Sequence, residues 1–248
     1  MNKTKIEWCS FTWNPVTGCL HTCEYCYARR IANRFDAKAI DGNPLPGGLH
    51  VLEDKLKSTP FPFGFEPVLH RYRLDEPQKW TKPSTIFVCS MADLFGKWVP
   101  DEWIEAVFAA CEKAPQHRYL FLTKNPQRYV KLDGRNKLPI RDNMWYGTTV
   151  TNDEQRLELA DSFGYLDREA KTFLSIEPIL EKVFCYKYVD WVIIGVETGN
   201  RKNKVVPEKA WIDNIVDDCD YNDIPVFMKD SLIPIVGEEN MRREFSWQ

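Results

Sequence analysis

The chain has 248 residues, of which 44% are hydrophobic and 28% charged, and its formal net charge is −3 at pH 7. This length suits one domain that buries most of its apolar surface, and the composition excludes a largely disordered protein. The charge argues against nucleic-acid binding by the whole surface, although a local basic patch is compatible with it. No apolar run can span a bilayer, and the first eight residues lack the apolar core of a signal peptide, so we expect a cytoplasmic protein without membrane contact.

The first elements enclose a group of cysteines. Residues 11–16 predict a strand that ends at Asn14-Pro15, and residues 27–35 predict a helix. In this helix Ile31 and Phe35 form an apolar side, and Arg29, Arg30 and Arg34 are available for a solvent-facing side. Cys19, Cys23 and Cys26 therefore lie between a strand and a helix, where a barrel places its chemistry.

Residues 39–84 contain no clear periodic element and are rich in proline and glycine. Irregular connections longer than roughly 12–15 residues are uncommon unless they serve as lids or binding loops. We therefore predict a lid or binding insertion here. Basic and aromatic residues alternate at 70–73 and 79–82, a combination suited to a phosphate or a base, but a solvated loop anchored by aromatic side chains explains them equally.

The rest of the chain alternates strands and helices. Each predicted strand is apolar enough to be buried on both faces, which indicates parallel strands joined by crossover helices in one α/β domain covering residues 1–248. The strands are expected at 85–90, 119–123, 145–150, 172–176, 191–196 and 225–228. Helices are expected to begin at Pro100-Asp101, at a capping box of Asn152 and Gln155, and at Pro207. Cys111 and Cys219 fall on apolar helix stripes and are expected to be packing residues.

The three cysteines have the spacing C-x3-C-x2-C, with Tyr25 directly before the last one. A structural zinc ion is usually held by four protein ligands, whereas a 4Fe-4S cluster held by three cysteines leaves one iron open. His21, between the first two cysteines, is a poor fourth ligand, because the turn directs its ring elsewhere. A Cys3His zinc site with a remote histidine, or simply buried thiols, remain alternatives.

This motif resembles the cluster-binding loop of the radical SAM superfamily. The resemblance implies a partial (β/α) barrel of about six or seven parallel strands and a 4Fe-4S cluster held by Cys19, Cys23 and Cys26. It also implies S-adenosylmethionine (AdoMet) chelated to the fourth iron and cleaved reductively to a carbon radical. Tyr25 takes the place of the aromatic residue beside the adenine, and the electron donor is expected to be an external protein of the flavodoxin or ferredoxin type.

Four further segments, 12–19, 87–95, 174–178 and 195–199, resemble a family of phage-associated, uncharacterised radical SAM-like proteins. Two of them depart from the expected patterns. The superfamily's Gly-Gly-Glu after the second strand is replaced by Ser90-Met91-Ala92-Asp93. The family's Gly-Gly-Glu-Ser-Gly near the sixth strand is replaced by Gly195-Val196-Glu197-Thr198-Gly199.

Polar residues stand where the predicted parallel strands end, which is where a barrel carries its catalytic groups. The expected cofactor-binding residues are Tyr25, Ser90, Asp93, Thr148, Thr149, Ser175, Glu177, Gly195 and Glu197. The expected catalytic residues are Cys89, Lys124, Glu177 and Lys229, with Cys89 a candidate hydrogen-atom donor whose presence burial explains equally.

Two of these carboxylates call for a partner. Glu177 and Glu197 follow buried strands, where an unpaired charge is costly, so each should have a cationic partner. The candidates are Lys124, Lys229 and the cofactor's ammonium. Gly195 within a strand suggests close approach of a ligand or another backbone.

The substrate is not encoded in a readable motif. A nucleotide, nucleoside or nucleic-acid base is our first expectation, and a peptide or small metabolite fits as well. One alternative function is a non-catalytic zinc or iron-sulfur protein that binds nucleic acid or a protein partner. Another is a barrel hydrolase that uses Glu177 and Glu197 as paired carboxylates.

Overall fold

The computed structural model describes residues 1–34, 39–40, 43–44, 47–55, 61–184, 188–199 and 201–248. The chain divides into two compact units, Met1–Leu122 and Thr123–Gln248. No helix of the described chain is long and apolar enough to cross a membrane. None of the described cysteines forms a disulfide, and Cys185 lies outside the described residues.

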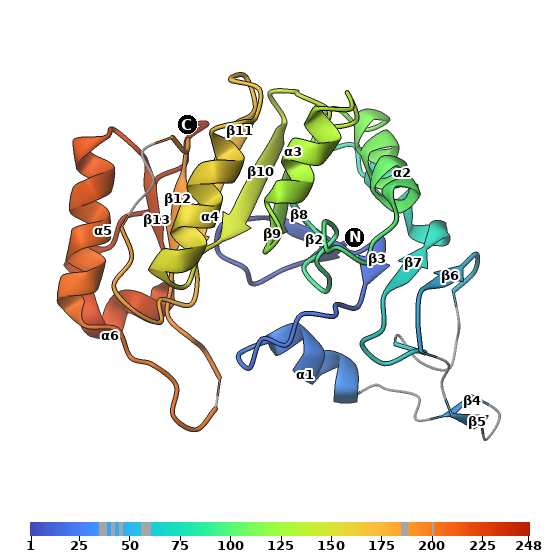
Figure 1. Cartoon of the computed structure of the whole chain (residues 1–248), viewed down its shortest axis with the longest axis horizontal. Coiled ribbons are helices and arrows are strands. Elements are labelled where there is room, and N and C mark those ends of the chain that lie inside the picture. Colours follow the sequence, from blue (N-terminus) through green and yellow to red (C-terminus); the bar gives the residue numbers. More distant parts are fainter. Residues whose placement is uncertain (35–38, 41–42, 45–46, 56–60, 185–187, 200) are drawn as a thin grey trace. The chain divides into compact units, whose positions relative to one another are not determined.

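The first unit contains a sheet with the strand order β1-β2-β8-β9 (Figure 1). β2, β8 and β9 run parallel, and β1 pairs antiparallel with β2. Trp13 lies opposite Val88, which lies opposite Phe121, so the three strands end nearly level. The elements are β1 (Asn2–Lys3), β2 (Phe11–Trp13), α1 (Tyr27–Arg34), β8 (Thr85–Val88), α2 (Asp101–Glu112) and β9 (Arg118–Thr123).

Short elements fill much of the segment predicted to be irregular. β3 (Val16–Thr17) pairs antiparallel with β7 (Val68–His70), and β7 pairs parallel with β6 (His50–Leu52). The segment also holds β4 (Ala39–Ile40), β5 (Asn43–Pro44), η1 (Arg71–Arg73) and η2 (Pro77–Lys79). Each has only two or three residues, too few to give a periodic pattern. A lid role for residues 39–84 stays a prediction.

The first predicted strand, residues 11–16, is wrong as one element. β2 ends at Trp13, and Val16 begins β3 in the other sheet. The break has a physical cause, because Pro15 has no N–H for a ladder and Oδ1 of Asn14 accepts the N–H of Met91 at 2.9 Å. The chain is thereby turned from the main sheet into the strand that precedes the cysteines.

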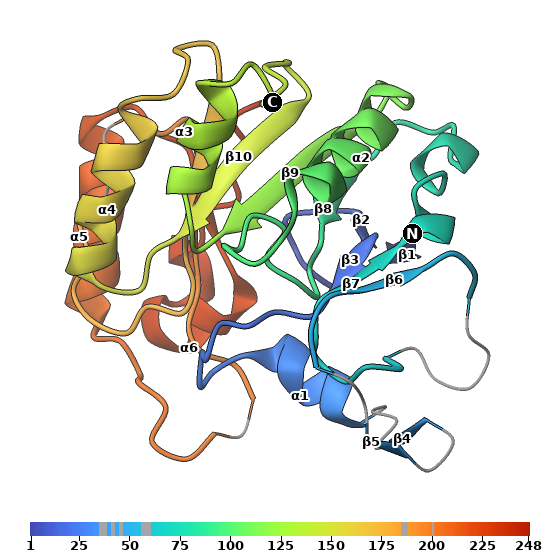
Figure 2. The ribbon, with the colours of Figure 1, turned by 45° about the vertical axis from the view of Figure 1, so that its right-hand side comes forward.

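The second unit is a sheet of four parallel strands in the order β10-β11-β12-β13. Figure 2 shows α4 and α5 side by side beside these strands. The elements are α3 (Gln127–Asp133), β10 (Met144–Thr149), α4 (Asp153–Phe163), β11 (Lys171–Ile176), β12 (Val192–Ile194), α5 (Lys209–Tyr221), β13 (Val226–Met228), η3 (Asp230–Leu232), α6 (Ile233–Val236) and η4 (Glu238–Asn240).

Helix boundaries follow their local signals in most places. α2 begins directly after Pro100 as predicted, and the N–H of Gln155 donates to Oδ1 of Asn152 at 2.9 Å, which confirms that cap. α5 begins at Lys209, two residues later than the predicted start at Pro207. α3 was not predicted, because its buried face has only Tyr129 and Leu132.

An aromatic cluster around Trp191 forms much of the second unit's core. Trp191 is fully buried, and its ring centroid lies 4.9 Å from that of Trp247 and 5.6 Å from that of Phe245. The C-terminal segment reaches this position because residues 242–244 pair with the edge strand β13, where Met228 N–H donates to the Arg242 carbonyl. The segment therefore covers a sheet edge that would otherwise expose unpaired backbone groups.

We predict that Trp191→Ala lowers the free energy of unfolding by about 3–5 kcal/mol, because it leaves a cavity among several rings. Urea denaturation followed by circular dichroism measures the change. Tyr221→Ala is the matched control, since Tyr221 is 90% exposed, and it should change stability by less than about 0.5 kcal/mol. A similar small change for both variants would contradict the assigned core.

Candidate functional site

The cysteine loop begins at Gly18, where any side chain would force the neighbouring backbone to move. Gly18 has φ +86°, and a Cβ added there would lie 1.9 Å from the carbonyl oxygen of Glu66. Its N–H donates to the carbonyl of Met91 at 2.9 Å, and the N–H of Cys19 donates to the carbonyl of Phe65 at 3.0 Å. The first cysteine is thus fixed by the main chain on two sides.

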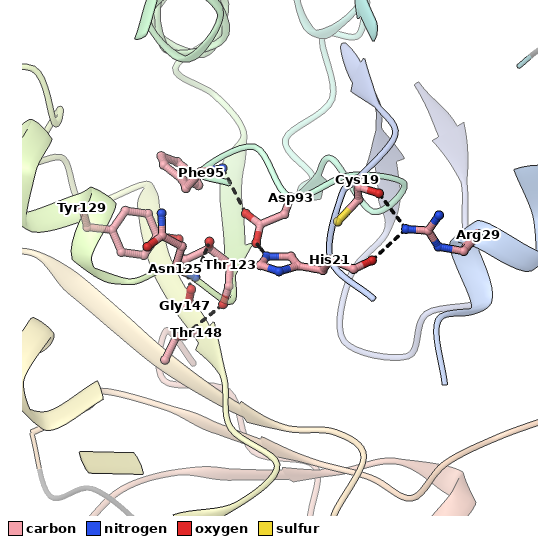
Figure 3. A network of polar contacts seen from close by, with 10 residues as sticks. All are labelled: Cys19, His21, Arg29, Asp93, Phe95, Thr123, Asn125, Tyr129, Gly147 and Thr148. Atoms are coloured by element: carbon pink, nitrogen blue, oxygen red, sulfur yellow. Dashed lines mark hydrogen bonds and ion pairs between the residues drawn. The ribbon is translucent and has the colours of Figure 1, made fainter. Parts of the chain in front are cut away.

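Arg29 on α1 holds the loop from its other end (Figure 3). Its Nη2 donates to the carbonyl oxygens of Cys19 at 2.8 Å and His21 at 2.7 Å, and its guanidinium lies 4.8 Å from the centre of the Phe65 ring. The prediction that Arg29 belongs to a solvent-facing side is wrong. Its position three residues after Cys26 is the signal that sequence reasoning missed.

The three thiols have different surroundings. Cys19 is 9% exposed, and burial, followed by the charge of Asp93, raises its pKa to about 12. Cys23 and Cys26 are half-buried, and Sγ of Cys26 accepts the N–H of Arg29 at 3.3 Å in the first turn of α1. Metal binding at Cys19 must therefore displace a proton that burial retains.

The ring of His21 is directed to Asp93, a partner that the sequence did not predict. Its Nε2 lies 2.9 Å from Oδ2 of Asp93, and its ring meets that of Trp98 edge-on at 4.9 Å between centroids. Asp93 is buried, and its Oδ1 accepts the N–H of Phe95 at 3.0 Å (Figure 3). Both oxygens of this expected cofactor-binding carboxylate thus have partners in the protein.

The donor set fits a cluster better than a single metal ion. Among the described residues no three His, Cys, Asp or Glu side chains converge on one ion position. The charges of Cys23 and Cys26 add to the effects of burial and Asp93 in raising the pKa of Cys19, so the three thiols are near enough to interact. A 4Fe-4S cluster binds each thiolate to a different iron, and its ligands therefore stand further apart than those of one ion.

Ser90 and Cys89 stand at the end of β8. Oγ of Ser90 donates to Oδ1 of Asn14 at 3.2 Å, and its carbonyl accepts the hydroxyl of Tyr27 at 2.9 Å. Cys89 has φ +58° and is buried, and burial raises its pKa to about 12. Its thiol is therefore protonated at neutral pH. Tyr25 is half-buried, and its cofactor contact stays a prediction.

A buried histidine supports the strand that leads into the loop. Nε2 of His70 lies 2.8 Å from Oγ1 of Thr17, and its Nδ1 lies 3.2 Å from the Tyr72 hydroxyl. His70 is 1% exposed. Burial, followed by the charge of Arg73, lowers its pKa to about 3, so the ring is neutral at physiological pH.

The carboxyl ends of β11, β12 and β13 lie next to one another in the second unit, as expected for parallel strands. Ser175 lies opposite Thr149, and Ile176, Ile194 and Met228 form the next row. The residues that follow this row in the three strands are Glu177, Gly195 and Lys229. The register therefore places three of the expected site residues side by side.

Glu177 and Lys229 form an ion pair, which confirms Lys229 as the predicted cationic partner. A Cβ added at Gly195 would lie 3.0 Å from Cδ of Lys229 and 3.5 Å from Cγ of Glu177. The close approach expected at this glycine is therefore made by these two side chains, rather than by another backbone. Gly195 leaves room for the pair to cross the end of β12.

Glu197 has a partner that sequence reasoning missed. Its two carboxylate oxygens accept from Nε and Nη2 of Arg201, each at 2.7 Å. The Glu197 side chain is 2% exposed, so this bidentate pair offsets the cost of a buried charge. The prediction that Glu197 has a cationic partner is confirmed, and this partner is Arg201. The role of Lys124 stays a prediction.

The threonines of β10 are largely enclosed. Oγ1 of Thr148 donates to the carbonyl of Thr123 at 2.9 Å, and the hydroxyl of Tyr129 donates to the carbonyl of Gly147 at 3.0 Å (Figure 3). Thr148 is 2%, Thr149 9% and Ser175 2% exposed. The structure thus gives Thr148 a bond to the main chain, and the cofactor contacts of all three stay predictions.

A family model described as "Protein of unknown function (DUF5131)" matches residues 3–233. No curated protein matches the chain. Among solved structures, a variant of spore photoproduct lyase matches with a TM-score of 0.52 and 10% identity over 92% of this chain and 78% of that chain. Another variant, with bound AdoMet and dinucleoside spore photoproduct, gives 0.51 and 11% over 86% and 74%.

A further spore photoproduct lyase structure, complexed with dinucleoside spore photoproduct, gives a TM-score of 0.46 and 14% identity over 72% of this chain. The match covers 48% of that chain, so the present chain spans about half its length. The matches above 0.5 show the fold, and they agree with the mostly parallel strands of both units. The predicted α/β partial barrel is confirmed.

We predict that the neutral state of His70 makes the protein lose stability in acid. Below pH 6.5 the His70 ring is protonated in the unfolded chain, whereas in the folded chain it stays neutral down to about pH 3. The contribution of His70 to the free energy of unfolding is therefore complete above pH 6.5 and is lost as the pH falls from 6.5 to about 3. The slope reaches about 1.4 kcal/mol per pH unit. Urea denaturation of the protein and of His70→Gln between pH 7 and about pH 5 tests this, and equal slopes would refute it.

We predict a coupling free energy of about 1–2 kcal/mol between Glu177 and Lys229, because both side chains are largely buried. The double-mutant cycle uses Glu177→Gln and Lys229→Met, measured by urea denaturation. Lys209 and Asp213 form the matched exposed pair, 53% and 48% accessible, and should couple by about 0.5 kcal/mol or less. A coupling free energy no larger than in this control would show that burial does not strengthen the Glu177–Lys229 pair.

Proposed function

The chain belongs to the family described as protein of unknown function (DUF5131), and we propose that it is a radical SAM enzyme. In this proposal Cys19, Cys23 and Cys26 hold a 4Fe-4S cluster, AdoMet is cleaved reductively, and the resulting radical acts on a nucleotide or nucleic-acid base. The observation that carries the proposal is the three-thiol loop, fixed by Gly18 and Arg29, in a chain with this fold. Kinship with phage-associated radical SAM-like proteins is part of the same proposal.

The protein's own task in this chemistry is positioning. When bound, the cluster would supply the electron that cleaves AdoMet. The main-chain bonds at Gly18 and Cys19 hold the residue that carries the first thiol, and Arg29 binds the loop through the carbonyls of Cys19 and His21. Because backbone groups of residues 18, 19 and 21 already have partners, this part of the loop would need little reorganisation to hold a cluster.

The next roles proposed concern the residues around AdoMet. The Glu177–Lys229 pair offers a carboxylate to an ammonium and an ammonium to a carboxylate, which are the two charged ends of an amino acid. Tyr25, Thr149, Ser175 and Gly195 are proposed to line the AdoMet site. Ser90, Asp93, Thr148 and Glu197 have partners within the protein and would act mainly by shaping it.

A second set of roles concerns the reaction itself. Cys89 is proposed as a hydrogen-atom donor, which the protonated state of its thiol permits. Lys124 is proposed to contact the substrate. The nucleic-acid substrate class is supported by the bound dinucleoside in a structure of similar fold. An external donor of the flavodoxin or ferredoxin type would supply electrons, and we propose a cytoplasmic setting that keeps the thiols reduced.

Anaerobic reconstitution with iron and sulfide tests the proposal. Visible absorption and EPR of the reduced protein, with and without AdoMet, should show a 4Fe-4S signal that changes when AdoMet binds. A colourless protein with one zinc per chain would instead establish the non-catalytic metal protein. Chromatography of the reaction mixture after reduction detects the cleaved cofactor.

We predict that Cys23→Ala abolishes AdoMet cleavage, because the cluster then lacks one of its three thiolate ligands. The iron content and the amount of 5'-deoxyadenosine formed after dithionite reduction measure the loss. Cys9→Ala is the matched control, since Cys9 lies outside the loop, and it should retain both. Full cleavage by Cys23→Ala would show that the ligands are misassigned.

A further inference from the structure

Trp98 lies in the connection between β8 and α2 and folds back towards the cysteine loop. Its side chain packs against the buried cluster of Cys19, Ala28, Ala32 and Phe65, and Cys26 packs against the same cluster. Its centroid lies 4.9 Å from that of His21 in an edge-on contact. The indole is therefore part of the wall around the cysteine loop.

This position depends on a glycine two residues earlier. A Cβ added at Gly96 would lie 2.4 Å from Cζ2 and 2.5 Å from Cε2 of Trp98. These atoms belong to the six-membered ring of the indole, so this ring lies against the backbone of residue 96. Because Gly96 has no side chain, the indole of Trp98 can occupy the space beside its backbone.

The indole nitrogen has no partner in the protein. Nε1 of Trp98 is buried, and within the described chain no acceptor forms a hydrogen bond with it. A buried donor without an acceptor costs about 1–3 kcal/mol, because it loses its bond to water. His21, which contacts the indole, has Asp93 as its partner, whereas Nε1 of Trp98 has none among the described residues.

We infer that the indole N–H of Trp98 is a hydrogen-bond donor to a sulfur of the cluster, and that it raises the cluster's reduction potential. The inference rests on the proposed function, since it requires the cluster at Cys19, Cys23 and Cys26. Sulfur ligands gain electron density on reduction, so a donor to sulfur stabilises the reduced form more than the oxidised form. Trp98 is thus a positioning and tuning residue that does not touch the substrate.

The test compares Trp98→Phe with Trp145→Phe. The first substitution keeps an apolar ring against the loop and removes the N–H. Trp145 is the matched control, because its Nε1 is also buried without a partner in the described chain, but it lies on β10 in the second unit. Each reconstituted protein is titrated against redox mediators and followed by EPR. ENDOR spectra in H2O and D2O detect an exchangeable proton coupled to the cluster.

Trp98→Phe should shift the reduction equilibrium roughly tenfold towards the oxidised cluster, about 59 mV lower for a one-electron couple. The exchangeable proton coupling should disappear, while Trp145→Phe keeps both the potential and the coupling. If Trp98→Phe does not load a cluster, Gly96→Ala serves in its place, because the added Cβ displaces the indole. It should cause the same downward shift.

Two outcomes overturn the inference, and they are distinguishable. A wild-type protein that binds no 4Fe-4S cluster removes the proposed function and the inference together. A wild-type protein that binds the cluster and cleaves AdoMet, with a potential and proton coupling unchanged in Trp98→Phe, removes the inference alone. A merely structural Trp98 would alter cluster content or stability and leave the coupled proton in place.

Discussion

The close approach of Gly18 to the backbone of Glu66 is the contact on which the cysteine loop depends. A side chain at this position would meet a carbonyl at 1.9 Å, and relief would require moving the segment that leads into β7. β7 pairs with β3, the strand directly before Gly18, so such a movement would also disturb the entry to the loop. The position of Cys19 therefore depends on both Gly18 and the small sheet of β3, β7 and β6.

Arg29 completes this unit with a single charged group. Its guanidinium satisfies two carbonyl oxygens of the turn and covers the face of Phe65, which lies on the other side of Cys19. A planar cation is suited to this task because it donates in fixed directions while stacking on a ring. The loop is thus held by interactions that leave Cys23 and Cys26 half-buried and accessible to a ligand.

Secondary-structure elements could be predicted from the sequence better than the interaction partners of individual side chains. Strand positions, the start of α2 and the three cysteines follow from apolar runs, caps and spacing, which are local. The Glu177–Lys229 pair was also predictable, since both residues follow buried parallel strands. Arg201, in contrast, pairs with Glu197 outside any helix or strand, where no periodic signal marks the two residues as partners. The break at Asn14 likewise depends on Met91, which lies 77 residues away.

Charge at the strand ends of the second unit limits what can bind there. Glu197 is neutralised by Arg201, and Glu177 by Lys229, so neither carboxylate is an open site for a simple cation. An ammonium brought to Glu177 would also meet Lys229, and a carboxylate brought to Lys229 would meet Glu177. A ligand that carries both charges avoids either repulsion, because each end faces its opposite. The pair therefore favours a zwitterionic group over a ligand of a single charge.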